Sequence, residues 1–312
     1  MGRYRFDPEL AAAVVMLPDS QVTDIATIRR LDAEYDRGLG EADLTGLVVQ
    51  DRTVPGFESE QVRVRVYRPI DGRRSAGVLH LHPGGFVSGT IDTDHIWKAE
   101  LSRELGITVV SVDYRLAPEH PYPAALEDCY AALRWLADEA SELAVDPSRI
   151  AVVGQSAGGG LAAALTLLAR DRGGPEICFQ MLVQPELDDR MASTSMQAFT
   201  DTPVWNRPRA TMSWDAYLGA DRRAIGAVPV YAAPARATDL AGLPPAYLSV
   251  AEFDPLRDEG ISYASALLQA GVRTELHVFP GTFHGSSIVT SAPVTQRESA
   301  ECIRALCDAL SL

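Results

Sequence analysis

The stretch Ile150-Ala151-Val152-Val153-Gly154-Gln155-Ser156-Ala157-Gly158-Gly159-Gly160 decides the fold. A short apolar, β-branched run meets the pattern G-x-S-x-G, and a long Ala/Leu-rich segment of helical character follows at once. This order is typical of a nucleophile elbow, a strained strand-to-helix turn that exposes one serine hydroxyl above a sheet. The flanking glycines permit the sharp turn and a close approach of backbone where a Cβ would clash. We therefore expect Ser156 to attack a carbonyl carbon.

The rest of the chain alternates between strand and helix patterns, which predicts an α/β fold with a mostly parallel central sheet covered by helices on both faces. Residues 62–67 alternate apolar and polar side chains, as a half-exposed antiparallel strand does. Short apolar runs occupy residues 77–81, 107–112, 150–153, 178–183, 246–250 and 274–279. Helical patterns lie between them, notably at residues 124–140, 161–170, 258–270 and 294–310.

Two segments fall outside this alternation. Residues 8–44 carry apolar side chains at helical spacing, so the first 47 residues read as a helical segment that precedes the domain of residues 48–312. Residues 186–237 are rich in Pro, Met and Trp and break the alternation. We expect this segment to insert between two strands beside the site and to add to its pocket or cover.

Composition narrows the class of protein. The chain has 312 residues and a net charge of −14, which argues against nucleic acid or an anionic membrane surface as a partner. Its four cysteines have no metal-type spacing and are expected to be free thiols in a reducing cytoplasm. The first 17 residues lack the apolar core of a signal peptide, and no stretch approaches a membrane span. We expect a soluble, cytoplasmic protein.

An elbow serine needs a base and an acid that orients the base. Among the six histidines, His284 follows the last apolar run in the glycine-flanked stretch Gly281-Thr282-Phe283-His284-Gly285, where a loop could bring a ring over the nucleophile. Asp254 lies just past the apolar run 246–250, in the expected order Ser, Asp, His, and Glu252 is the second choice.

The oxyanion site is expected in the stretch His82-Pro83-Gly84-Gly85-Phe86, because consecutive glycines after a strand free backbone N–H groups to point into a cavity. Gly84, Gly85 and Ala157 would supply three donors. The pair His80-x-His82 shares one strand face and could in principle hold a metal ion, but no further ligand cluster supports this, so no metal is expected.

Together these motifs resemble the hormone-sensitive-lipase-like branch of the α/β-hydrolases. His82–Phe86 corresponds to its H-G-G-G-F loop, and Gly154-Gln155-Ser156-Ala157-Gly158-Gly159 to its G-D-S-A-G-G elbow. Asp254-Pro255-Leu256 fits its acid motif and Phe283-His284-Gly285 its base motif. The resemblance implies Ser156 as nucleophile, His284 as base, Asp254 as orienting acid, no cofactor, an N-terminal helical cap over the site, and a homodimer.

The chain departs from the family pattern at two positions. Pro83 replaces the first loop glycine and removes its N–H, but the donor glycines of the family are the second and third, which are present. Gln155 replaces the usual Asp before the nucleophile, so a neutral amide stands where the family has a charge.

We expect a serine carboxylesterase that hydrolyses small, short-to-medium acyl esters through an acyl-enzyme. Phe86, Trp205 and Phe283 are the candidates for lining its apolar pocket, because two adjoin motif residues and one lies in the insertion. The same triad would serve an amide, lactone or carbamate hydrolase or an acyltransferase. A non-catalytic ligand receptor on this fold is a further alternative, although such proteins are expected to lose triad members.

Overall fold

The computed structural model describes residues 4–219 and 228–312. Residues 1–3 of the expected cap and residues 220–227 of the expected insertion lie outside the described residues. The described chain folds around one eight-stranded sheet, with the order β1-β2-β4-β3-β5-β6-β7-β8. β1 and β2 pair antiparallel, as do β2 and β4, and every other neighbouring pair is parallel. The predicted mostly parallel α/β fold is therefore confirmed.

The strands have these bounds: β1 Leu47–Pro55, β2 Gln61–Pro69, β3 Ser75–Leu81, β4 Thr108–Asp113, β5 Val145–Gln155, β6 Phe179–Val183, β7 Ala246–Phe253 and β8 Thr274–Phe283. The α-helices are α1 Pro8–Val14, α2 Ile25–Gly38, α3 His95–Leu105, α4 Ala124–Asp138, α5 Ala157–Arg172, α6 Thr194–Ala198, α7 Arg207–Leu218, α9 Arg257–Gln269 and α10 Pro293–Leu310. Short 3-10 helices span Phe57–Ser59, Pro234–Arg236 and Ser286–Ile288.

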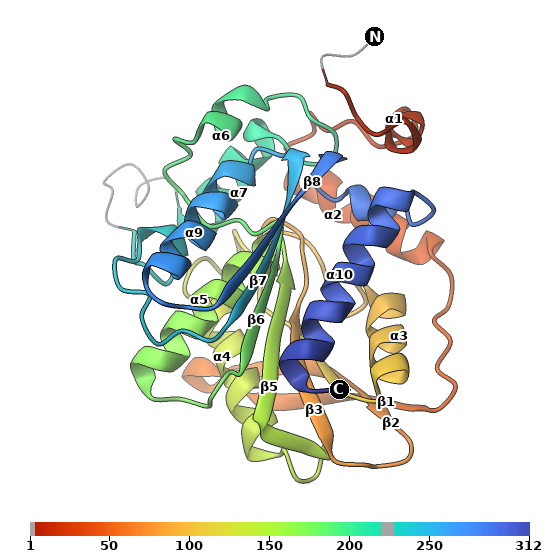
Figure 1. Cartoon of the computed structure of the whole chain (residues 1–312), viewed down its shortest axis with the longest axis vertical. Coiled ribbons are helices and arrows are strands. Elements are labelled where there is room, and N and C mark those ends of the chain that lie inside the picture. Colours follow the sequence, from red (N-terminus) through yellow and green to blue (C-terminus); the bar gives the residue numbers. More distant parts are fainter. Residues whose placement is uncertain (1–3, 220–227) are drawn as a thin grey trace.

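The sheet separates two helical layers. Helices α4, α5 and α9 lie on one face, while α3 and α10 lie on the other (Figure 1). Strand β5 shows why both faces close: Ile150 and Val152 join the core with α4 and α5, whereas Ala151 and Val153 join the second core beside α3 and α10. Successive side chains of a strand point to opposite faces, so a strand buried on both sides must be apolar at every position.

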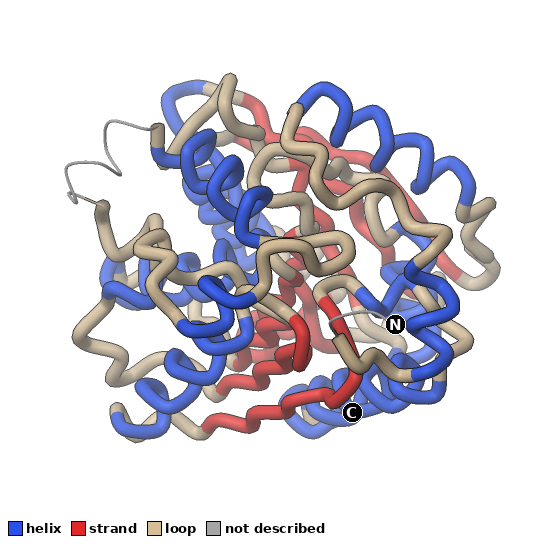
Figure 2. The backbone as a smooth tube through the Cα atoms, turned by 90° about the horizontal axis from the view of Figure 1, so that it is seen from above, coloured by secondary structure: helices blue, strands red, loops and turns tan. Residues whose placement is uncertain are grey.

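The parallel strands end at one common edge of the sheet, so the loops after β3, β5, β6, β7 and β8 gather there. Figure 2 looks down on this end of the molecule, where α1, α2, α6 and α7 lie over the strands. The N-terminal segment and the insertion contact each other here: Arg209 of α7 donates to the carbonyls of Asp19 and Val22, and Asn206 donates to that of Ser20.

The elbow is packed tightly against its neighbours. A Cβ on Gly158, in the first turn of α5, would lie 2.1 Å from the carbonyl oxygen of Leu81 at the end of β3. A Cβ on Gly154 would lie 2.1 Å from the carbonyl oxygen of Gly158. Side chains at these positions would therefore push the helix away from both strands. The elbow and the loop after β3 are held in direct backbone contact.

No helix among the described residues is both long and apolar enough to cross a membrane.

Candidate active site

Ser156 stands at the turn between β5 and α5. Its backbone has φ 57° and ψ −122°, a region that non-glycine residues rarely adopt, and such strain is characteristic of an elbow nucleophile. Its N–H donates to the carbonyl of Val183 in β6 at 2.9 Å, which anchors the turn to the neighbouring strand. The residue is 4 % exposed, so its hydroxyl faces a largely enclosed space.

His284 and Asp254 form a hydrogen-bonded chain with Ser156. His284 Nε2 lies 2.9 Å from Ser156 Oγ, and His284 Nδ1 lies 2.7 Å from Asp254 Oδ2. The carboxylate requires a proton on Nδ1, so in a neutral ring Nε2 accepts from the serine hydroxyl. Asp254 is wholly buried and also accepts from the N–H of Leu256 at 2.9 Å, which fixes the orientation of its carboxylate.

Glu252, the second choice for the acid, lies elsewhere. Its Oε2 accepts from the N–H of Gly281 at 2.7 Å, and its backbone carbonyl accepts from Arg257. Glu252 thus holds the loop that carries His284 but has no hydrogen bond to the imidazole. The structure brings Asp254 to His284 instead.

Two residues that the sequence analysis did not identify support the histidine loop. Gln184, directly after β6, accepts from the N–H of Gly285 through Oε1 at 2.8 Å. Its amide nitrogen lies 3.4 Å from Glu298 Oε1 on α10, which also accepts from Ser249 Oγ at 3.2 Å. Burial raises the pKa of Glu298. These contacts hold the backbone directly after His284.

The three expected oxyanion donors share one physical arrangement, in which the carbonyl of the same peptide unit is held by other groups. The Ser156 carbonyl, which shares a peptide with the N–H of Ala157, accepts from the N–H groups of Gly160 and Glu186, both at 3.0 Å. The Gly84 carbonyl, which shares a peptide with the N–H of Gly85, accepts from Val87 at 3.1 Å and Ser88 at 2.9 Å. Because a trans peptide points its two polar groups in opposite directions, each N–H is turned away from the groups that hold its carbonyl.

His82 provides the same support for the remaining donor, Gly84. His82 Nδ1 lies 2.8 Å from the carbonyl oxygen of Pro83, the group that shares a peptide with the N–H of Gly84. The ring stacks on Tyr114 with its centroid 4.0 Å from that of the phenol. Burial lowers the pKa of His82 to about 3, so the ring is neutral and Nδ1 carries the proton donated to Pro83.

The pair His80 and His82 lacks the surroundings of a metal site. His82 Nδ1 is engaged by Pro83, and burial, with a smaller contribution from the nearby Lys98 ammonium, lowers the pKa of both rings. Lys98 is itself buried and donates to Ser111 Oγ and the Ile91 carbonyl. A positive charge enclosed beside the two rings disfavours a cation between them.

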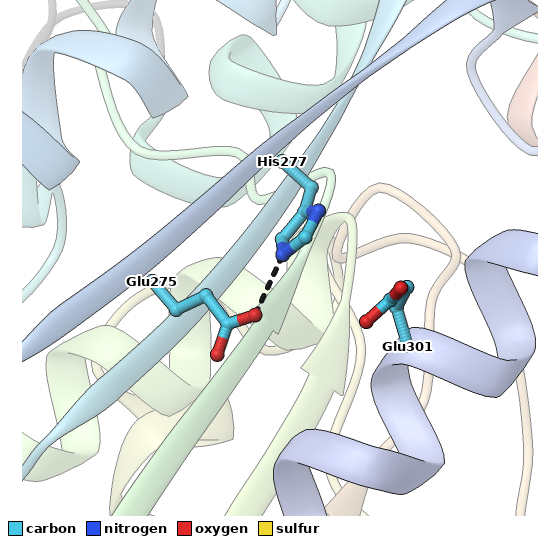
Figure 3. Close-up of side chains that lie close together, drawn as sticks. All are labelled: Glu275, His277 and Glu301. Carbon is cyan, nitrogen blue, oxygen red and sulfur yellow. Dashed lines mark hydrogen bonds and ion pairs between the residues drawn. The ribbon is translucent and has the colours of Figure 1, made fainter.

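Among the described residues, one group of side chains has metal-type proximity. Glu275 and His277 on β8 face Glu301 on α10, with their ligand atoms within 4.8 Å of one another (Figure 3). Arg304 forms an ion pair with Glu301 at 2.8 Å and a second ion pair with Glu275. Glu275 Oε1 also lies 2.7 Å from His277 Nε2. The guanidinium already occupies both carboxylates, so we interpret this half-buried cluster as an ion-pair network between β8 and α10.

The three aromatic candidates for the pocket lie in different surroundings. The ring of Phe86 stacks on Tyr217 at 4.0 Å between centroids, within the main core. Phe283 is wholly buried and contacts Phe6 edge-on at 5.3 Å. Trp205 lies 5.7 Å from the ring of His284, and a Cβ on Gly85 would approach its indole to 2.5 Å. Trp205, from residues 186–237, thus lies directly against His284 and the loop after β3.

The two departures from the family pattern lie in the loop after β3 and at the elbow. The carbonyl of Pro83 is held by His82, so the loop is ordered without the N–H that proline lacks. Within the described part of the chain, the side chain of Gln155 has no hydrogen bond across the elbow, while its backbone pairs with Val183 in the β5–β6 ladder.

Comparison with known proteins identifies relatives that match most of the chain. A family model described as alpha/beta hydrolase fold matches residues 78–287, which include all the residues of the hydrogen-bonded chain. Carboxylesterase NlhH of Mycobacterium tuberculosis is 45% identical over 250 residues, which cover 78% of this chain and 76% of that protein. Esterase LipI of the same organism is 42% identical over 227 residues, covering 72% and 70%.

Solved structures give the same picture over nearly the full length. A structure described as a bacterial heroin esterase is 48% identical, with a TM-score of 0.93 and coverage of 98% of both chains. The esterase LipW of Mycobacterium marinum is 40% identical, with a TM-score of 0.87 and coverage of 98% of this chain and 96% of that one.

The support that His82 gives to Gly84 can be tested with His82→Phe, which keeps a ring for Tyr114 to stack on but removes the donor to Pro83. Loss of one hydrogen bond of about 1.4 kcal/mol predicts a roughly tenfold fall in kcat for a p-nitrophenyl ester, with KM little changed. Thermal unfolding of the same sample serves as the control for folding. An unchanged kcat in a folded variant would show that Gly84 needs no such support.

Proposed function

The chain belongs to the α/β-hydrolases, in their hormone-sensitive-lipase-like branch, and we propose that it hydrolyses carboxylic esters through an acyl-enzyme formed on Ser156. The observation that carries this proposal is the unbroken hydrogen-bonded chain from Ser156 through His284 to Asp254. Esterases are the named activity of its relatives, so an ester is favoured over an amide, lactone or carbamate, over acyl transfer, and over a non-catalytic receptor.

In the first half of the reaction, Ser156 Oγ attacks the ester carbonyl carbon while its proton passes to His284 Nε2. Asp254 stabilises the imidazolium that forms and keeps its Nδ1–H directed at the carboxylate. The carbonyl oxygen becomes an oxyanion, which the N–H groups of Gly84, Gly85 and Ala157 receive. The imidazolium then returns its proton to the departing alkoxide, the alcohol leaves, and the acyl-enzyme remains.

In the second half, water takes the place of the alcohol. His284 Nε2 removes its proton as the water oxygen attacks the acyl carbon, and the same three N–H groups stabilise the second oxyanion. Collapse of this intermediate returns the proton to Ser156 Oγ and releases the carboxylic acid. Each N–H is expected to contribute about 3 kcal/mol to stabilisation of the transition state, because it is oriented before the charge develops.

Ser156→Ala tests the nucleophile. We expect kcat for p-nitrophenyl acetate to fall by about a millionfold, to the background left by the oxyanion donors and binding. The matched control is Ser286→Ala, because Ser286 is buried just after His284 and its hydroxyl has no hydrogen-bond partner among the described residues.

A fluorophosphonate probe gives a second measurement on the same proteins. The wild type and Ser286→Ala should be labelled, and Ser156→Ala should not. Substantial hydrolysis by the Ser156→Ala variant, or labelling of that variant by the probe, would overturn the assignment of the nucleophile.

We also propose that the substrates are small esters with short to medium acyl chains, and that Trp205 limits their size. The support is the position of the indole against both His284 and Gly85, with only 7 % of the residue exposed. Trp205 belongs to the insertion, which contacts the N-terminal segment through Asn206 and Arg209. We propose that these two segments together form the cap over the site.

An acyl-chain series tests this limit. Trp205→Ala should raise kcat/KM for octanoyl relative to butyryl p-nitrophenyl esters by at least about tenfold, since pocket contacts with methylene groups carry free energies of about 1–3 kcal/mol. Trp97→Ala is the control, because Trp97 packs near His80 in the other helical layer. A chain-length profile that is the same in both variants would exclude Trp205 as the limit.

Finally, we propose a homodimer located in the cytoplasm. The four cysteines are free thiols, which suits a reducing compartment, and β8 is an open edge strand that could pair with a second copy. Chemical cross-linking in intact source cells, followed by fractionation, should recover a cross-linked pair in the cytosolic fraction. Recovery of monomer alone, or of the protein only outside that fraction, would contradict the corresponding half of the proposal.

A further inference from the structure

Glu186 is a wholly buried carboxyl group that the reaction described above does not use. It lies two residues after Gln184 at the carboxyl end of β6, and its backbone N–H donates to the Ser156 carbonyl at 3.0 Å. Its side-chain Oε2 lies 3.2 Å from Ser213 Oγ on α7. Ser213 Oγ in turn lies 2.9 Å from the carbonyl oxygen of Gly85. The side chain is therefore linked through one hydroxyl to the oxyanion loop.

The number of protons available along these hydrogen bonds decides whether the Glu186 carboxyl group is ionised. Ser213 has a single hydroxyl proton, and the Gly85 carbonyl can only accept it. If Glu186 were ionised, both neighbours of Ser213 would be acceptors and one of them would be left without a donor in a buried place. If Glu186 is a neutral acid, its O–H donates to Ser213 Oγ, and the Ser213 hydroxyl donates to Gly85. Only the neutral acid satisfies both contacts of the Ser213 hydroxyl.

The charges around Glu186 favour the same state. The carboxyl group of Asp254 faces it from the loop after β7 and that of Glu259 from α9, while the phenols of Tyr114 and Tyr217, which face it from the end of β4 and from α7, are uncharged because burial raises their pKa. No cationic side chain of the described residues offsets them. Burial first, and then the negative charge of Asp254, raise the pKa of Glu186 to about 8.

The Gly85 carbonyl matters because it sets one of the two peptide planes that meet at Gly85. The other plane, which carries the N–H of Gly85, is held through the Gly84 carbonyl. Gly85 has φ 57°, and the following Phe86 has φ 59°, so the loop passes through two left-handed residues in succession. A glycine there can rotate freely unless its carbonyl is held.

We propose that Glu186, kept as a neutral carboxylic acid, is a positioning residue that acts through Ser213 to hold Gly85 in the oxyanion-binding conformation. This inference rests on the proposed function, because it concerns the oxyanion of the same reaction. Loss of the Glu186 proton turns the Ser213 hydroxyl toward the carboxylate, releases the Gly85 carbonyl and slows turnover. The arrangement is intact below pH 8 and is lost as the pH rises through that value.

The experiment compares pH profiles of kcat from pH 6 to 10, with the non-enzymatic hydrolysis of the ester subtracted. The wild type should show a fall in kcat with a midpoint near pH 8, and KM should change little. Glu186→Gln, whose amide donates to Ser213 at every pH, should lose this fall. Ser213→Ala should lower kcat about tenfold at pH 7, as expected for one lost hydrogen bond, and should lose the fall as well.

A double-mutant comparison separates a relay from two independent effects. If Glu186 acts through Ser213, adding Glu186→Gln to Ser213→Ala should change the profile no further. Lys98→Met is the matched control, because burial lowers the pKa of Lys98 to about 8 as well, but its ammonium donates to Ser111 and Ile91 and lies over the ring of Tyr67, away from Ser213. This variant should keep the alkaline fall of the wild type.

Infrared difference spectra between the wild type and Glu186→Gln supply a readout that does not need activity. A protonated-carboxyl band should be present in the wild type at pH 6 and disappear near pH 8. An alkaline fall that survives in Glu186→Gln, or a carboxylate band at pH 6, would overturn the role of Glu186. A wild type that hydrolyses no ester but shows the protonated band would instead contradict the proposed function.

Discussion

The planarity of the trans peptide is the constraint on which this site depends. Each expected oxyanion donor is a backbone N–H group, and no side-chain torsion sets the direction of such a group. The direction of each N–H is set by the carbonyl on the opposite side of the same peptide. His82 holds the carbonyl of Pro83, and the N–H groups of Val87 and Ser88 hold that of Gly84. The N–H groups of Gly160 and Glu186 hold the carbonyl of Ser156. The sheet brings these carbonyls within reach because its parallel strands end at one edge.

The carboxyl groups behind the site divide into two kinds. Asp254 lies on the reacting chain and accepts from His284 and the N–H of Leu256, so its charge is compensated by donors. Glu186, Glu259 and Glu298 are buried with raised pKa values, because water is excluded and negative groups face one another. Each of these side chains lies within hydrogen-bond distance of groups on another segment and so connects parts of the fold. Glu259, for instance, receives the N–H groups of Leu187 and Asp188 and fixes the start of the insertion.

The sequence was sufficient to predict the parts of the site whose signals are local. The elbow, the glycine loop after β3, and the loops carrying Asp254 and His284 each follow an apolar run, and parallel strands bring such loops together. Gln184, Glu186, Ser213 and Glu298 could not be found in this way, because their partners lie 27 to more than 100 residues away and no local pattern marks them. Phe86 and Phe283 adjoin motif residues, but neighbours in a strand or turn point to different sides, and both rings lie in packed surroundings. Trp205 had only its place in the insertion to indicate it, and its contact with Gly85 required the fold.

The close packing of Gly158 on the end of β3 has a consequence for how such a protein can diversify. Nucleophile and oxyanion loop are joined by backbone contact, so neither can shift without the other, and substitutions there disturb the chemistry directly. The proposed cap belongs to a separate part of the chain, from which Trp205 contacts the ring of His284. Selection can therefore act on the surroundings of Trp205, whereas Glu186 and Ser213 of the same segment stay linked to the loop after β3. A lineage could come to accept new ester substrates through substitutions in the proposed cap, while the geometry of Ser156 and the loop after β3 is inherited unchanged.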